Sequence, residues 1–341
     1  MDRTIAAFVA FAACQGPPPG GEDLPPSDPS TGALDTPDLP PSTASTETTT
    51  PATQDRVVQF VALGDAGEGN TAQHEVAAAI EQVCLARGCE FALYLGDNFY
   101  DSGVDSPDDS QFQTKFEDVY RHLWFPFYVV LGNHDYGADG LGIEFWKSDH
   151  YIDYAATQTQ FVFPNTYYSF TVEHVQFIAF NTTELFFGLT WNQADWVTEL
   201  LSSQPPEVEW TLGFGHHPYI SNGQHGNAGT YEGIPEWTPL TEIPRGQFIQ
   251  EFFDDNLCGN LQVYLSGHDH NRQVLEPNCG TEFIVSGAGA KTTDMPGRGN
   301  PTFFEDDTKE GFLWVEIREN LFTAAFYDST GALDYEQTFA L

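Results

Sequence analysis

The chain has 341 residues, with 12 Lys and Arg against 50 Asp and Glu, and a formal net charge of −38. This acidity excludes a general electrostatic nucleic-acid binder and a polybasic contact with anionic lipid, because no basic stripe can neutralise phosphates. Aromatic residues make up 14% of the sequence, which is enough to build a hydrophobic core. The length predicts two domains, or one large α/β unit with extra sequence.

The N-terminus resembles an export signal. The apolar run from Ile5 to Ala13 is too short to span a bilayer but fits the hydrophobic region of a secretory signal. The FAAC sequence that ends at Cys14 resembles a bacterial lipobox. We therefore predict a signal peptide over residues 1–13, cleavage before Cys14, and a lipid anchor on that cysteine. Plain secretion and a chance apolar start are the alternatives.

A proline-rich segment follows the signal. Residues 15–54 contain 10 prolines and no aromatic, Lys or Arg residue. Such a segment cannot bury enough apolar area to offset its ordering entropy, so residues 14–54 are predicted to be a disordered tether. The remaining residues, 55–341, hold 43 of the acidic and 11 of the basic residues, a net charge of −32. The acidity therefore belongs to the predicted folded domain.

Cysteine usage agrees with export to an oxidising compartment. Four cysteines remain after Cys14, and an even number in an exported chain favours two disulfides. Proximity in the sequence favours Cys84–Cys89 and Cys258–Cys279 among the three pairings. Four reduced buried thiols are the alternative, and the lack of a CxxC spacing argues against a cysteine zinc site.

Strands and helices alternate from residue 56 onward. The expected elements are, in chain order, a strand at 56–63, a helix at 70–87, a strand at 91–95, a helix at 111–123, a strand at 127–131, two strands within 167–181, a helix at 190–202, a strand at 209–214, a helix at 244–255, a strand at 261–265 and an antiparallel meander over 311–341. This alternation is typical of an α/β sheet. Ligands bind such sheets at the carboxyl ends of the strands.

Five of the predicted strands end in a glycine that is followed by Asp, Asn or His. The five loops are GDAG at 64–67, GDNFY at 96–100, GNHD at 132–135, GHHP at 215–218 and GHDH at 267–270. Glycine permits the sharp turn that points the next side chain into the crevice. Oxygen and imidazole donors without thiolate suit Fe, Mn or Zn. One such loop is usually a simple turn, but five in one chain indicate a metal site.

In order and composition, the five loops resemble the conserved blocks of the metallophosphoesterase superfamily. Tyr100, three residues after Asp97, narrows the resemblance to the purple acid phosphatases, and GDNFY stands as it does in their small, tartrate-resistant branch. The resemblance implies a single catalytic domain over residues 55–341. Its fold class would be α/β, a four-layer α/β/β/α sandwich of two mixed β-sheets.

The resemblance also implies a ligand set for Fe(III) and a second divalent metal, which could be Fe, Mn or Zn. The ferric site would take Asp65, Asp97, Tyr100 and His270, and the divalent site would take Asp97 as a bridge with Asn133, His216 and His268. Carboxylate and phenolate suit the hard Fe(III), and imidazole and amide suit its softer neighbour.

Three further residues carry the implied chemistry, in which a metal-activated hydroxide attacks phosphorus. His134 follows the ligand Asn133 and is the expected general acid, with Asp135 as the group that orients it. His225 lies nine residues after His216 and resembles the second substrate-binding histidine of the family.

The sequence thus predicts an acid phosphatase that hydrolyses small phosphate monoesters outside the cytoplasm. It would be a periplasmic or cell-surface lipoprotein, or a secreted protein, and a monomer with no nucleic-acid partner. Two alternatives stay open at this stage. One is a phosphodiesterase or nucleotidase that uses the same dimetal site, and the other is a non-catalytic acidic surface lipoprotein whose metals are structural.

Overall fold

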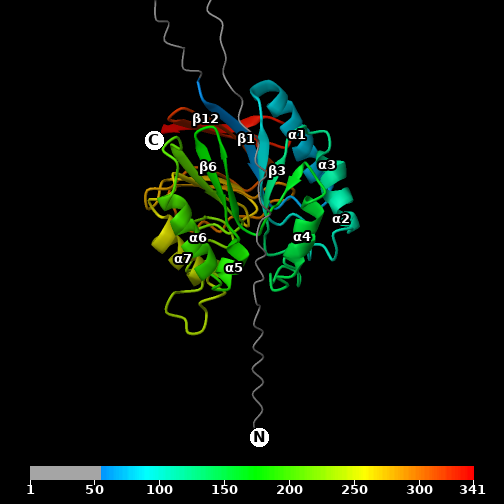
Figure 1. Ribbon diagram of the computed structural model, residues 1–341. Coiled ribbons are helices and arrows are strands. Elements are labelled where there is room, and N and C mark those ends of the chain that lie inside the picture. The colour runs from blue at the N-terminus through cyan, green and yellow to red at the C-terminus, as the bar shows by residue number, and fades with distance from the viewer. Residues whose placement is uncertain (1–54) are drawn as a thin grey trace, which may run out of the picture. The chain divides into compact units, whose positions relative to one another are not determined.

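The structure, a computed structural model, describes residues 55–341 as two β-sheets of seven strands each with helices outside them. The predicted signal peptide, Cys14 and the tether lie outside the described residues. Figure 1 places helices α1 to α4 beside one sheet and α5 to α7 beside the other. The predicted four-layer α/β/β/α sandwich is therefore confirmed.

The first sheet has the order β14-β13-β12-β1-β2-β3-β4. Its strands are β1 (Val57–Leu63), β2 (Phe91–Leu95), β3 (Phe127–Val130), β4 (Phe161–Val162), β12 (Gly311–Arg318), β13 (Leu321–Asp328) and β14 (Leu333–Ala340). Strands β1 to β4 are parallel, and the predicted C-terminal meander joins them through the antiparallel pair β1 and β12.

The second sheet has the order β11-β9-β10-β8-β7-β6-β5. Its strands are β5 (Tyr168–Val172), β6 (Val175–Ala179), β7 (Trp210–Phe214), β8 (Val263–Ser266), β9 (Arg272–Leu275), β10 (Glu282–Ser286) and β11 (Thr302–Asp306). Strands β6, β7, β8 and β10 are parallel, and β5, β9 and β11 are antiparallel to their neighbours. Both sheets are thus mixed, as predicted.

Seven helices connect the strands. They are α1 (Thr71–Arg87), α2 (Ser110–Phe112), α3 (Asp118–Tyr120), α4 (Lys147–Ala155), α5 (Thr182–Phe186), α6 (Trp191–Ser202) and α7 (Gln247–Phe252). Helix α1 begins where the sequence predicts, because the Asn70 side chain accepts a hydrogen bond of 2.9 Å from the backbone N–H of Gln73. Among residues 55–341, no helix is long and apolar enough to cross a membrane.

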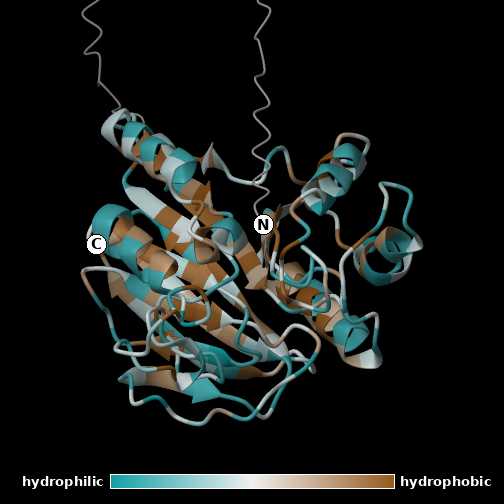
Figure 2. Ribbon diagram, turned by 90° about the horizontal axis from the view of Figure 1, so that it is seen from below, coloured by the Kyte–Doolittle hydropathy of each residue, from teal (hydrophilic) through white to brown (hydrophobic). Residues whose placement is uncertain are grey.

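Aromatic side chains fill the space between the sheets. Phe60 of β1 stacks on Phe91 of β2 with ring centroids 5.1 Å apart, and Phe177 of β6 meets Phe60 edge-on at 5.4 Å. Such pairs add specific geometry to the burial of large apolar area. Figure 2 shows the hydrophobic strands running through the middle of the molecule, with hydrophilic residues on the outer helices and loops.

Two predicted helices differ from the structure. The helix predicted at 111–123 consists of α2, a π-helical turn and α3. In the π-helical turn, the backbone carbonyl of Lys115 accepts a hydrogen bond of 2.7 Å from the Gln73 side chain of α1. This contact with another helix accompanies the break in the regular α-helical hydrogen bonds. The helix predicted at 244–255 begins later, after Gly246 in a left-handed conformation. The short strands β4, β9, β10 and β11 and the helices α4 and α5 were not predicted.

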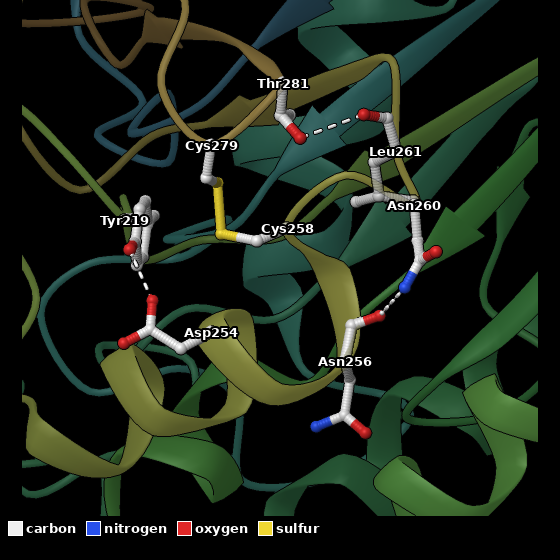
Figure 3. Close-up of a disulfide and its surroundings, with 8 residues drawn as sticks. All are labelled: Tyr219, Asp254, Asn256, Cys258, Asn260, Leu261, Cys279 and Thr281. Carbon is white, nitrogen blue, oxygen red and sulfur yellow. Dashed lines mark hydrogen bonds between the residues drawn. A yellow bond between two sulfur atoms is a disulfide. The ribbon is translucent and has the colours of Figure 1, made fainter.

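Both predicted disulfides are confirmed. Cys84 is bonded to Cys89, five residues away, and Cys258 is bonded to Cys279, 21 residues away. Figure 3 shows the second bridge beside the hydrogen bonds from Tyr219 to Asp254 and from Thr281 to the Leu261 carbonyl. The bridge therefore ties the segment before β8 to the segment before β10.

The two disulfides should differ in their contribution to stability. Replacing Cys258 and Cys279 together by serine opens a loop of 21 residues, and loop-closure entropy predicts a loss of about 3 kcal/mol in the free energy of unfolding. The double variant of Cys84 and Cys89 opens a loop of five residues and should lose about 2 kcal/mol. Urea unfolding measures both values, and a larger loss for the shorter loop would contradict the prediction.

Candidate metal centre

The seven predicted ligands lie at one end of the two sheets, because the parallel strands of each sheet end there. Asp65 follows β1, Asp97 and Tyr100 follow β2, and Asn133 follows β3. From the second sheet, His216 follows β7, and His268 and His270 follow β8. Residues up to 205 positions apart in the sequence are thus brought together by strand ends alone.

Asp97 stands between two groups of donor atoms. Its Oδ2 lies 3.0 Å from the Tyr100 hydroxyl and 3.4 Å from Nε2 of His216. Its Oδ1 accepts a hydrogen bond of 2.9 Å from the backbone N–H of His134. The carboxylate is fully buried and touches both groups, which is the position that a bridging ligand requires.

The first group contains Tyr100, Asp65 and His270. The Tyr100 hydroxyl donates to Oδ1 of Asp65 at 3.1 Å and lies 3.3 Å from Nε2 of His270. Oδ2 of Asp65 accepts a hydrogen bond of 2.8 Å from the backbone N–H of His268, which fixes the carboxylate. A phenol, a carboxylate and an imidazole therefore converge beside Asp97.

The second group contains His216, Asn133 and His268. Nε2 of His216 lies 3.0 Å from the Asn133 side-chain oxygen and 3.1 Å from Nδ1 of His268. Nδ1 of His216 faces the Leu95 carbonyl at 2.9 Å, and a carbonyl can only accept. That contact assigns the proton of a neutral ring to Nδ1 and leaves the Nε2 lone pair free to bind a metal.

The loops that carry these ligands hold strained backbone conformations. Asp65, Asp97 and His268 have positive φ angles of 56°, 52° and 69°, a region that side-chain-bearing residues seldom adopt. Gly132 is required beside them, because a Cβ there would come within 2.2 Å of Oδ1 of Asp97. Strain of this kind persists only where the surrounding structure holds it, and it gathers at functional sites.

The charge of the donor set fits cations. Asp65 and Asp97 are fully buried, and among residues 55–341 neither pairs with a Lys or Arg. Burial next to Asp65 and Asp97 raises the pKa of Tyr100 well above its usual value, and burial lowers the pKa of His268, so that imidazole stays neutral. Buried carboxylates need compensating positive charge. This set of two carboxylates, three imidazoles, an amide and a phenol suits Fe, Mn or Zn.

His134 lies at the edge of this cluster. Nδ1 of its ring lies 2.7 Å from the Asp101 carbonyl, and the ring packs 4.5 Å from the Tyr100 ring. Gly140 covers the other face, where a Cβ would come within 2.6 Å of the imidazole. The ring is therefore held by a backbone carbonyl and by close packing.

Asp135 does not make the contact with His134 that the sequence suggested. Its buried carboxylate accepts hydrogen bonds of 2.8–3.1 Å from the backbone N–H groups of Asn98, Phe99 and Gly132, from the Asn98 amide and from the Tyr151 hydroxyl. The Asp101 carbonyl orients His134 in its place. Asp135 therefore joins two ligand-bearing loops to each other.

His225 reaches the same site from a distant loop. Its ring stacks on His268 with centroids 3.9 Å apart, and its Nδ1 lies 2.5 Å from Oε1 of Glu232. Burial opposes protonation, but the hydrogen bond to Glu232 outweighs it and raises the pKa of His225. The backbone N–H of His225 donates to Oδ1 of Asp269 at 2.8 Å, which ties this loop to the GHDH loop.

Three residues that hold the predicted site residues in place were missed by the sequence analysis. Thr182 accepts from the backbone N–H groups of His216 and His217 at 3.1 and 3.0 Å. Asp269 and Glu232 position His225, as described above. Two of them could have been found in the sequence, because Thr182 directly follows a predicted strand and Asp269 lies inside the GHDH motif. Glu232 had no such signal, because only the folded loop brings it to His225.

The role of Asp135 can be tested by stability. Asp135→Ala leaves three buried N–H groups without an acceptor, so the free energy of unfolding should fall by about 3 kcal/mol or more. Asp195→Ala, which removes an exposed carboxylate on α6, should change it by less than about 0.5 kcal/mol. Chemical denaturation compares the two, and equal stabilities would refute the bracing role.

Comparisons with known proteins agree with this geometry. Tartrate-resistant acid phosphatase type 5 of Sus scrofa is 27% identical, with 84% of this chain and 88% of the relative covered. Purple acid phosphatase 3 of Arabidopsis thaliana is 25% identical, with 82% and 77% covered. Two solved structures share the fold. GAP50 of Plasmodium has a TM-score of 0.63 and 21% identity, with 84% of this chain and 89% of the solved chain covered. Purple acid phosphatase PPD1 of yellow lupin has a TM-score of 0.59 and 16% identity, with 84% of this chain and 54% of the solved chain covered. Residues 58–272 match the calcineurin-like phosphoesterase family. The chain belongs to that family.

Proposed function

We propose that this protein is a phosphoric monoester hydrolase of the purple acid phosphatase type. The observation that carries the proposal is the position of Asp97 between two buried groups of donors, with Tyr100 in one group and two imidazoles in the other. The names of the relatives, which are acid phosphatases, support the same reaction.

Each donor group would hold one metal ion. Tyr100, Asp65 and His270 suit Fe(III), His216, Asn133 and His268 suit Fe, Mn or Zn in the divalent state, and Asp97 would be shared. When bound, the two ions supply positive charge to the phosphoryl oxygens and lower the pKa of a water molecule.

In this proposal His134 supplies the proton for the leaving group. Since Nδ1 donates to the Asp101 carbonyl, Nε2 is the ring atom left to exchange a proton. During hydrolysis a water oxygen bonds to phosphorus, the ester P–O bond breaks, and the leaving oxygen takes the proton from Nε2. The products are an alcohol or phenol and inorganic phosphate.

His225 would bind the phosphoryl group. Its Nδ1 is engaged by Glu232, so its Nε2 faces outward as a donor when the ring is protonated. The raised pKa keeps that charged form present at higher pH. A cationic donor opposite His134 would neutralise part of the negative charge that builds up on the phosphoryl oxygens.

The cellular location is also part of the proposal. Two disulfides are typical of an oxidising compartment, and the N-terminal sequence resembles an export signal. We infer that the enzyme acts outside the cytoplasm. The lipid anchor at Cys14 and the monomeric state stay predictions.

The Fe(III) ligand can be tested by colour. The iron-loaded protein should show a visible phenolate-to-iron charge-transfer band, and Tyr100→Phe should abolish it because the phenol is removed. Absorption spectra with metal analysis of the same samples test this. Tyr335→Phe, which changes a phenol on β14 away from the site, is the control. A band that survives in Tyr100→Phe would refute the assignment.

The acid role of His134 can be tested by turnover. His134→Ala should lower kcat for phenyl phosphate by about 10²–10⁴-fold, since general acid catalysis contributes about that much. Both metals should stay bound, because His134 is not among the proposed ligands. Phosphate released after fixed reaction times gives kcat, and metal analysis gives the number of metal ions that stay bound.

Two results would contradict these roles. Unchanged kcat in His134→Ala would reject the acid. Release of phenol from diphenyl phosphate at a rate equal to or above that from phenyl phosphate would favour a phosphodiesterase over the monoesterase proposed here.

A further inference from the structure

A cavity of ≈ 250 Å³ opens directly from the second donor group. Asn133 and His268 line one end of it, and His217 and His225 line the wall beside them. Gly140, which packs against the imidazole of the proposed acid His134, also lines the cavity, so a leaving group that His134 protonates would lie beside it.

The remaining wall of the cavity is apolar. It is formed by Leu141, Phe186, Phe187, Tyr231 and Pro244. Leu141 belongs to the loop after β3 in the first sheet, whereas the others come from α5 and the segment before α7 in the second. The two halves of the molecule therefore build one apolar surface beside the reaction site, and apolar groups gain free energy by burial against it.

The charged groups that line the cavity are paired with each other, because Oε1 of Glu232 lies 2.5 Å from Nδ1 of His225, the ring that the proposed function holds protonated. Glu232 is its one carboxylate, and among the described residues no Lys or Arg lines it. Two cations on the neighbouring loops are turned to the backbone instead. Arg245 donates to the Gly229 carbonyl at 3.0 Å, and Arg298 donates to the carbonyls of Gly223 and Gln224.

One polar atom in the lining is unused. The Thr183 side chain is 1% exposed and lines the cavity, and its Oγ1 has no hydrogen-bond partner among residues 55–341. Because this oxygen is itself buried, the Thr183 side chain presents no polar atom to the cavity.

We propose that this cavity selects phosphate monoesters whose leaving group is uncharged and largely apolar, such as a phenol, and disfavours those whose leaving group carries a negative charge. The inference rests on the proposed function, because it assigns the leaving-group side of the same reaction. Apolar contact with Leu141 and the aromatic wall favours the neutral group, whereas a carboxylate on the leaving group would lose its hydration against the same wall.

Two substrates that differ only in a charge on the leaving group test the preference of the cavity. Phenyl phosphate and 4-carboxyphenyl phosphate release similar phenols in the same reaction and differ in one carboxylate. The dimetal enzyme should show a kcat/KM at least about 10-fold higher for phenyl phosphate, because the carboxylate of the other leaving group would be desolvated against the apolar wall. Leu141→Lys places a cation on the wall and should bring the ratio of the two kcat/KM values to within about 3-fold.

Leu85→Lys is the control for Leu141→Lys. Leu85 on α1 is 71% exposed and Leu141 is 67% exposed, so both variants add the same charge at a surface leucine, but Leu85 does not line the cavity. The ratio should be unchanged in Leu85→Lys, and Leu141→Met, which keeps an apolar wall, should retain it as well.

The outcomes separate the inference from the proposed function. A wild-type ratio near one, or equal shifts in Leu85→Lys and Leu141→Lys, would overturn the selection by this cavity while leaving a phosphatase. Absence of phosphate release from every monoester by protein that carries both metals would overturn the proposed function itself.

Discussion

The structure depends on the burial of two carboxylates side by side. Asp65 and Asp97 lie where the two sheets meet, and each has a carboxylate oxygen within 3.1 Å of the Tyr100 hydroxyl. Two negative charges removed from water in this way are costly unless positive charge balances them. The phenol and the amide are uncharged. Burial opposes protonation of His216, but Asp97 beside it outweighs burial and raises its pKa to about 9, so one imidazole can balance one carboxylate and bound cations would balance the other. The left-handed backbone of both aspartates shows that the chain accepts local strain to hold them there.

Other buried carboxylates in the same loops are satisfied differently. Asp135 accepts from three backbone N–H groups, and Asp269 accepts from the backbone N–H of His225. These hydrogen bonds stabilise a carboxylate without a metal. One residue type thus has two roles at this end of the sheets. Asp65 and Asp97 each accept one backbone N–H and keep the other oxygen toward the phenol and the imidazoles, whereas Asp135 uses both oxygens on N–H and O–H donors. Asp135 and Asp269 hold the ligand loops in one arrangement, which is a requirement for a preorganised site.

The sequence predicted those parts of the molecule that local pattern determines. Long apolar runs such as 56–63 and 91–95 mark buried strands, and the polar residues after them fall together because parallel strands end at one edge. The clustering of the seven predicted ligands follows from that regularity, whereas their assignment to metals came from the family resemblance and both disulfides came from proximity in the sequence. The cavity follows from none of these, since Leu141, Tyr231 and Glu232 lie in irregular segments whose course is set by tertiary contacts. Short strands such as β4 and β9 carry too few residues for a periodic signal.

The same limit explains the misplaced role of Asp135. Adjacent residues in a loop need not face the same way, and here the His134 ring turns to the Asp101 carbonyl while the Asp135 side chain turns inward to Asn98. A motif shows which side chains are available, but hydrogen-bond geometry decides what each one does. The leaving-group cavity shows the same principle on a larger scale, because its two walls come from different sheets.

The position of β1 has a consequence for the order of folding. This first strand of the domain lies inside its sheet, between β2 and β12, and its register pairs Val57 with Arg318. The sheet can therefore close only after nearly the whole chain has emerged, since contacts of such long separation form late and at a high entropic cost. Both disulfides join residues no more than 21 positions apart, so they can form earlier. The two local bridges can thus be in place before the central sheet closes around β1.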